Sequence, residues 1–423
     1  MHANFIKMKK IILLLIFSAL YVFFYSAAAQ TKGYSLPEIL DLINKDSLKR
    51  TVQDMQNFES RLCTKTVGHN RKVAQYLVGR LKNYGIENAR IDSFFVDFTK
   101  YEWLVGKVNQ NMYNVLGTLK GTGATDSTVI IGAHLDAISY IKVASEYVLT
   151  PTAPGADDNA TGCAVMIEMA RIMHKYNIKP HHNIDFMAYD AEEIGLKGAY
   201  YDAEKRKNAG ENIIVMLNND MVGHQPKEEK PWEVFLHWYD NALDVTEKAR
   251  QALINYTTVT PFVPDASQND LAQASDSWAY YQYGFKATFA IEKHFSPYYH
   301  SANDLTEYLN FEYCRQIARM NFVLLADYAA IDYSLGIKQD NIKLDNLIEV
   351  FPNPANDVIR VHNYNDIVIN KIDIYDISGR LMVSLPIQRQ QQNIIRVDNF
   401  SNGIYFIRIY TDKGIVNKKI IIN

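Results

Sequence analysis

Five short polar segments contain residue types that bind metal ions and transfer protons. They are residues 132–136 (GAHLD), 155–159 (GADDN), 189–193 (YDAEE), 218–221 (NNDM) and 298–301 (YYHS). Imidazole and carboxylate groups, with no cysteine among them, form a ligand set for zinc or a similar divalent cation. Two histidines and several carboxylates exceed the three protein ligands of one catalytic zinc. We therefore expect two metal ions that share a carboxylate, and a further carboxylate that acts as general base on metal-bound water.

Each segment taken alone also has a structural interpretation. Asp158 could cap the helix that follows it, and Glu192 could be a solvated loop charge. The five segments together, in this order, favour the metal site. The remaining histidines, such as His174 and His237, lack metal-ligand spacing and are expected at the surface or in the core. The chain has no His-Glu-x-x-His motif, which excludes that type of zinc protease.

Three of the polar segments directly follow short apolar runs that predict buried strands. His134 follows residues 128–133, Glu192 and Glu193 follow 183–189, and Asp220 follows 212–217. In open α/β sheets, binding sites form beyond the carboxyl ends of the strands. The polar groups should therefore meet at one edge of a sheet, although they are far apart in the sequence.

Residues 34–335 alternate between helical and strand patterns. Further strands are predicted at 114–119 and 287–291, and helices at 69–84, 162–176 and 240–255. This alternation predicts an α/β fold in which helices flank a mixed, mostly parallel central sheet. The walls of the substrate pocket are expected from residues 222–240 and 257–285.

From residue 347 onward the pattern contains strands only. Seven short strands are predicted, at residues 348–351, 357–362, 367–375, 380–385, 393–397, 404–410 and 415–422. Turn signals such as Ser378-Gly379 separate several of them. We expect a small all-β, immunoglobulin-like sandwich at 347–423, joined by a polar linker at 336–346 to the first domain at 30–335.

The N-terminus has the layout of a secretory signal peptide. Three lysines precede an apolar run of about 14 residues, and Ala27, Ala28 and Ala29 follow it. This run is short of the roughly 20 residues that span a bilayer. We expect cleavage after Ala29, which makes residues 1–29 the signal peptide, and no membrane span in the mature protein.

The composition is that of an ordinary globular protein. The chain has 423 residues, of which 48% are hydrophobic and 22% are charged. Its formal net charge of −3 argues against a nucleic-acid partner bound through bulk positive charge. Three cysteines, Cys63, Cys163 and Cys314, exclude a disulfide scaffold, and at least one of them must be unpaired within the chain.

Residues 50–330 resemble the co-catalytic di-zinc aminopeptidases, a family that includes secreted leucyl aminopeptidases, glutamate carboxypeptidases and glutaminyl cyclases. The resemblance depends on GAHLD at 132–136, PGADDNATG at 154–162 and DAEEIGLKG at 190–198. Residues 275–277 depart from it, since Ser-Asp-Ser stands where the family often has Ser-Asp-His.

The resemblance implies a role for each polar residue of the five segments. One zinc would be held by His134 and Asp220, the other by Glu193 and His300, and Asp158 would bridge them. Glu192 would be the general base. Asp136 would orient the His134 imidazole, and Tyr298 or Tyr299 could stabilise the oxyanion.

We accordingly expect a secreted exopeptidase with two zinc ions per chain that removes N-terminal residues from peptides with a free N-terminus. Three alternatives stay open. They are a glutaminyl cyclase-like acyltransferase on the same scaffold, another exopeptidase specificity, and an inactive binding protein that keeps the fold.

The last domain resembles the C-terminal sorting domain of type IX secretion in Bacteroidetes. The resemblance depends on residues 350–355 (VFPNPA), 375–380 (YDISGR) and 401–405 (SNGIY), in this order. It implies recognition by the type IX secretion machinery and an extracellular or cell-surface location. The alternative is a carbohydrate-binding or spacer sandwich.

Overall fold

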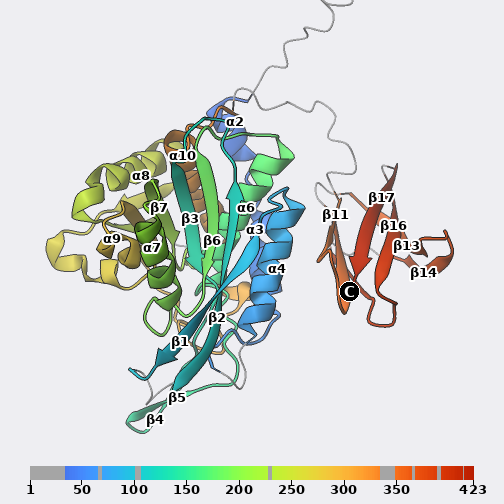
Figure 1. Ribbon diagram of the computed structural model, residues 1–423, viewed down its shortest axis with the longest axis horizontal. Helices are drawn as coiled ribbons and strands as arrows, with labels where there is room; N and C mark the ends of the chain where they lie inside the picture. Colours follow the sequence, from blue (N-terminus) through green and yellow to red (C-terminus); the bar gives the residue numbers. More distant parts are fainter. Residues whose placement is uncertain are drawn as a thin grey trace, which may run out of the picture.

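The computed structural model describes residues 34–64, 69–100, 106–226, 231–333, 348–363, 367–387, 392–412 and 414–423. The predicted signal peptide and linker therefore lie outside the described residues. The described chain forms a larger α/β unit and a smaller β unit, which lie side by side in Figure 1.

An eight-stranded mixed sheet forms the centre of the larger unit. Its strands are β1 (Arg90–Phe98), β2 (Val108–Leu119), β3 (Thr128–His134), β6 (Asn183–Tyr189), β7 (Ile213–Asn219), β8 (Trp232–His237), β9 (Val259–Phe262) and β10 (Ala287–Glu292). Their order is β1-β2-β6-β3-β7-β10-β8-β9. The β6–β3, β3–β7, β7–β10 and β8–β9 pairs are parallel and the others antiparallel. The predicted mixed, mostly parallel sheet is confirmed.

The central strands are buried because helices cover the sheet on both faces. Every residue of β3, β6 and β10 is buried, as expected for parallel strands between helix layers. Figure 1 shows α7 (Lys197–Ala209) in front of the sheet and α10 (Phe311–Tyr328) behind it.

The other helices complete the two layers. They are α2 (Leu36–Asp41), α3 (Lys45–Gln56), α4 (Asn70–Asn83), α6 (Ala160–Lys175), α8 (Leu243–Tyr256) and α9 (Ser277–Gln282). Asn159 caps α6, because its side-chain oxygen accepts the Gly162 N–H at 2.9 Å. This cap matters for the site, since Asn159 directly follows Asp158.

Several elements differ from the sequence-based expectation. The helix predicted at 240–255 starts with a 3-10 turn, Asp240–Ala242, before α8. The strand predicted at 114–119 begins earlier, at Val108, because β2 continues past the end of β6 while it still pairs with β1. Strands β1, β8 and β9 have no counterpart in the prediction. They lie toward the edges of the sheet, where β8 alternates buried and half-buried residues and the four-residue β9 contains a proline.

A two-stranded hairpin lies outside the main sheet. It consists of β4 (Tyr140–Val143) and β5 (Glu146–Leu149), and it extends from the lower end of the unit in Figure 1. The sequence analysis does not predict it.

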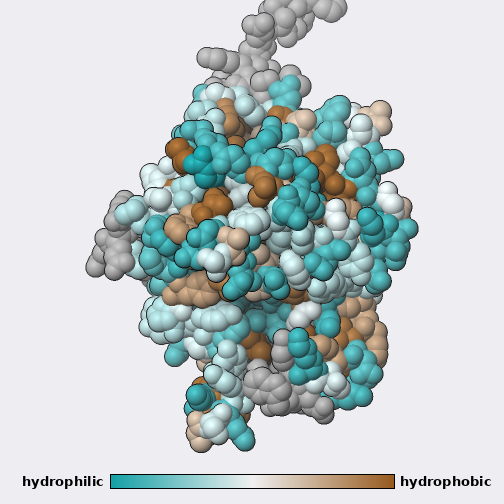
Figure 2. All heavy atoms as spheres, turned by 90° about the vertical axis from the view of Figure 1, so that its left-hand side faces the viewer, coloured by the Kyte–Doolittle hydropathy of each residue, from teal (hydrophilic) through white to brown (hydrophobic). Residues whose placement is uncertain are grey.

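The three cysteines are buried and unpaired. No helix among the described residues combines the length and apolar character needed to cross a bilayer. Figure 2 views the side formed by α8 and α9, where hydrophobic residues form separate patches among hydrophilic ones.

The smaller unit is built from two antiparallel sheets. One contains β11 (Ile348–Phe351), β12 (Val358–Asn363) and β15 (Gln392–Arg396), and the other β14 (Leu381–Pro386), β13 (Ile369–Asp376), β16 (Gly403–Thr411) and β17 (Gly414–Ile422). Isoleucine and valine side chains from both sheets share one core. The predicted small all-β sandwich is confirmed.

The first strand of the smaller unit packs into the larger one. Phe351 is buried, and the guanidinium groups of Arg50 and Arg80 each lie 5.2 Å from its ring centre. Glu349 pairs with Arg50 at 3.2 Å and accepts the Tyr84 hydroxyl at 3.2 Å. The contact therefore joins a buried aromatic ring to paired charges on α3 and α4.

Replacing Phe351 by alanine should weaken the contact between the two units. We expect Phe351→Ala to lower the free energy of unfolding by about 3 kcal/mol, because it leaves a cavity between two guanidinium groups. Urea denaturation measures this change. Phe406→Ala, at an exposed position of β16, is the control and should stay within about 0.5 kcal/mol of wild type. Equal effects of the two substitutions would contradict the interpretation that the buried Phe351 ring stabilises this contact.

Candidate active site

The predicted site residues meet at the carboxyl ends of the parallel strands. His134 is the last residue of β3, Glu192 and Glu193 follow β6, and Asp220 follows β7. The structure brings these four side chains together with Asp158 and His300 around one cavity of about 300 Å³.

One half of the site surrounds His134. Its Nε2 lies 3.1 Å from Asp158 Oδ1, 3.3 Å from Asp220 Oδ1 and 4.0 Å from Glu192 Oε2. Asp220 is held in turn by the Ser275 hydroxyl, which donates to its Oδ2 at 2.7 Å. Three carboxylates thus approach a single imidazole nitrogen.

The other half surrounds His300. Its Nε2 lies 3.1 Å from Asp158 Oδ2 and 3.1 Å from Glu193 Oε2. Asp158 therefore directs one carboxylate oxygen toward each histidine. This is the geometry of a carboxylate shared by two cation positions.

Backbone contacts hold the Asp158 loop in place. The Asp304 carboxylate accepts the backbone N–H groups of Asp157, at 3.0 Å, and Asp158, at 3.1 Å. The fully buried Arg61 donates to the carbonyls of Leu135 and Gly155, at 2.7 Å each. The sequence analysis did not identify Asp304 or Arg61, because nothing in the sequence around them indicates which backbone groups they contact.

Asp136 lies behind the ligand groups and holds the backbone of the 189–193 segment. Its carboxylate accepts the backbone N–H groups of Glu192, at 3.1 Å, and Glu193, at 3.2 Å. The Cys63 thiol donates to it at 2.9 Å. Burial, then the neighbouring Asp136, raises the pKa of this thiol well above its ordinary value, so the thiol keeps its proton.

The predicted contact between Asp136 and His134 takes a different form. His134 Nδ1 lies 3.1 Å from the backbone carbonyl oxygen of Asp136, but 3.7 Å from its carboxylate. The carbonyl is therefore the hydrogen-bond acceptor of this imidazole. The orienting role of the Asp136 side chain stays a prediction.

The buried carboxylates repel one another and raise the affinity of the site for positive charge. Burial raises the pKa of Glu192 well above its ordinary value, and raises that of Glu193 to about 7 with help from Asp158. Burial opposes protonation of His300, but Glu193 and Asp158 raise its pKa to about 12. Burial would also raise the pKa of Asp158, yet hydrogen bonds from both histidines lower it. A pocket with these shifts attracts cations.

The donor set fits a pair of zinc ions. Zinc–ligand bonds of 2.0–2.2 Å in tetrahedral geometry separate neighbouring ligand atoms by about 3.3 to 3.6 Å. The separations of 3.1 to 3.3 Å around His134 and His300 lie at or just below the lower end of this range, so small side-chain shifts would admit the ions.

Mostly apolar side chains form the rest of the cavity wall. They include Met221, Leu271, Phe289, Ile291 and Phe295, with Tyr299 beside them. Of the two segments expected to form the wall, residues 257–285 contribute Leu271, Gln273 and Ala274. No described residue of 222–240 lines the cavity. The Tyr299 ring stacks on His300 with 3.6 Å between ring centres.

Residues 114–325 match the model of Peptidase family M28. The chain belongs to peptidase family M28. This membership confirms the prediction of a metallopeptidase enzyme and the resemblance to aminopeptidases. Residues 349–423 of this M28 peptidase match the secretion system C-terminal sorting domain, which confirms the predicted nature of the last domain.

Known proteins resemble this M28 peptidase over most of its length. A probable leucine aminopeptidase of Arthroderma otae is 26% identical over 314 residues, which cover 72% of this chain and 78% of the relative. A zinc aminopeptidase from Bacillus subtilis has a TM-score of 0.53 at 16% identity, covering 71% and 99% of the two chains. A glutaminyl cyclase from Bacteroides thetaiotaomicron has a TM-score of 0.52 at 17% identity, covering 67% and 97%. The two structural likenesses show a shared fold.

The role of Asp304 can be tested by removing one of its acceptor oxygens. We expect Asp304→Asn to lower the free energy of unfolding by about 2 kcal/mol. The NH2 group that replaces one oxygen would face backbone N–H groups and could not accept their hydrogen bonds. Thermal denaturation measures the change. Asp126→Asn, at an exposed position, should leave the midpoint unchanged. An Asp304→Asn protein as stable as this control would show that the contact is dispensable.

Proposed function

We propose that this protein is an exported zinc aminopeptidase that hydrolyses the N-terminal residue from peptides. The observation that carries the proposal is the position of Asp158, whose two oxygens each lie 3.1 Å from a different histidine. The leucine aminopeptidase name of an M28 relative supports the choice of reaction.

Two zinc ions would occupy the site. His134 and Asp220 would hold one, Glu193 and His300 the other, and Asp158 would bind both. When bound, the ions would acidify a water molecule and polarise the peptide carbonyl. The name of the Bacillus subtilis zinc aminopeptidase supports the choice of metal.

Glu192 would act as the general base. Its carboxylate lies beside the proposed metal positions, 4.0 Å from His134 Nε2, without being needed as a ligand. It would accept the proton of the attacking water and return it to the leaving nitrogen.

The cavity favours an exopeptidase. A volume of about 300 Å³ is at the small end for ligand pockets, and its apolar wall accommodates one side chain. The free amino group of the substrate would lie near the carboxylates.

The C-terminal domain supports export. Because residues 349–423 match a secretion sorting domain, we propose that type IX machinery carries the protein out of the cell after Sec-dependent passage directed by residues 1–29.

The base assignment is tested with Glu192→Gln. This variant should bind as much zinc as wild type but lose about 10²- to 10⁴-fold in kcat, because only the proton acceptor is removed. Zinc content by mass spectrometry and hydrolysis of a leucine-peptide measure the two effects. Glu87→Gln, at an exposed loop position, should be unchanged in both. Full activity of Glu192→Gln would falsify the assignment.

The reaction type is tested with a peptide panel. Peptides with a free N-terminus should lose one residue, their acetylated counterparts should be stable, and a chelator should stop hydrolysis. A glutaminyl cyclase is the second candidate, because a cyclase shares the fold. On a peptide with N-terminal glutamine, a cyclase releases ammonia and closes a ring, whereas a peptidase releases glutamine.

A further inference from the structure

The two histidines of the site are supported by different parts of the chain. His134 Nδ1 has its partner two residues away, at the Asp136 carbonyl, so the same buried segment supplies ligand and support. His300 Nδ1 lies 3.1 Å from the hydroxyl of Tyr140, which is 160 residues away in the sequence and is the first residue of β4.

Tyr140 contacts His300 at three points. Besides the hydroxyl contact, the Tyr140 backbone N–H donates to the His300 carbonyl at 3.0 Å. The two rings meet edge to face, with 5.4 Å between their centres. These contacts matter because His300 has a φ of +52°, a left-handed conformation that favours glycine. A non-glycine residue in this conformation needs its surroundings to hold it.

The hydroxyl of Tyr140 lies on the side of His300 opposite to the carboxylates. With zinc on Nε2, the proton of the imidazole resides on Nδ1 and requires an acceptor. The Tyr140 hydroxyl oxygen lies within hydrogen-bond distance of Nδ1 and can accept this proton. Metal-bound histidines usually donate this proton to a carboxylate, a backbone carbonyl or water, so the phenol replaces the usual partner.

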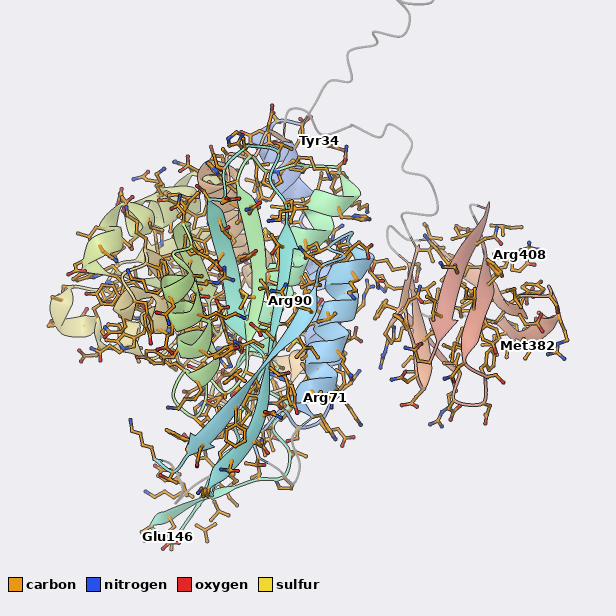
Figure 3. All side chains as sticks on the ribbon, in the orientation of Figure 1. Tyr34, Arg71, Arg90, Glu146, Met382 and Arg408 are labelled. Atoms are coloured by element: carbon orange, nitrogen blue, oxygen red, sulfur yellow. The ribbon has the colours of Figure 1, made fainter. Side chains whose placement is uncertain are left out.

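The base of the hairpin is anchored, whereas its end is exposed. Tyr140 and Leu149 pack against a small buried cluster that includes Leu62 and Ala153. Farther along, Ile141 and Val148 are 54% and 46% exposed. Figure 3 labels Glu146 at the far end of the hairpin, away from the helices. Tyr140 thus occupies a fixed position at the point where the hairpin leaves the body of the protein.

We propose that Tyr140 is a positioning residue that orients His300 for its zinc ion through the hydroxyl contact with Nδ1. The proposal rests on the proposed function, because it requires zinc at His300. It adds a residue from the β4–β5 hairpin to the support of the site and assigns this hairpin a part in metal binding.

Tyr140→Phe in the full-length mature chain tests the proposal, since it removes one oxygen and keeps the ring and the backbone contact. Competition with a chromogenic chelator should resolve two zinc dissociation constants for wild type. In Tyr140→Phe one of them should rise about 10- to 100-fold, while the other and the thermal midpoint stay close to wild type. Excess zinc should restore peptide hydrolysis.

Tyr147→Phe is the matched control. Tyr147 lies on β5 with its ring 5.2 Å from that of Tyr140, and the substitution removes a hydroxyl from the same hairpin. It should leave both zinc constants unchanged. Unchanged constants in Tyr140→Phe, or equal weakening in both variants, would overturn the proposal.

The same titration separates the two hypotheses. A wild-type chain that binds a single zinc contradicts the proposed two-metal function. The Tyr140 proposal then stands or fails on whether Tyr140→Phe weakens that one ion.

Discussion

The structure depends on the close approach of carboxylates inside one buried pocket. Asp158, Glu192, Glu193 and Asp220 line the same cavity with two histidines. Burying one charge is costly, and burying several like charges is far more so, unless cations or hydrogen bonds compensate. The raised pKa values of Glu192 and Glu193 express this cost. A pair of divalent ions would remove it, which is the physical reason to expect metal here.

The scaffold keeps these charges together without using the ligand atoms themselves. Asp136 accepts the backbone N–H groups of Glu192 and Glu193, and Asp304 accepts those of the Asp157–Asp158 loop. The backbone N–H groups thus stabilise the carboxylates of Asp136 and Asp304. The same hydrogen bonds fix the segments that carry the carboxylates facing the cavity. Because the support comes from the backbone, the oxygens that face the cavity stay free to bind cations. The Tyr140 hydroxyl likewise contacts His300 at Nδ1, the ring nitrogen that does not face the carboxylates.

The buried centre was more predictable than the periphery. The apolar runs at 128–133, 183–189 and 287–291 match β3, β6 and β10 within one residue, because strands covered on both faces are rich in apolar residues. The edge strand β9 and the hairpin of β4 and β5 lack this signal, since most of their residues are half-buried or exposed. In β8, the half-buried Glu233 and Phe235 interrupt the run of buried residues.

The amino-acid sequence by itself determined the fold class, the sorting domain and the residue types of the site, because strand-end His, Asp and Glu in this order are specific. Tertiary structure alone decided which atoms face one another. It showed that Asp158 lies between His134 and His300. It also showed that Arg61 and Asp304 contact the backbone of the Asp158 loop and that Tyr140 contacts His300. Such contacts join residues far apart along the chain, and no local pattern encodes them, because each partner satisfies only general rules of burial and hydrogen bonding.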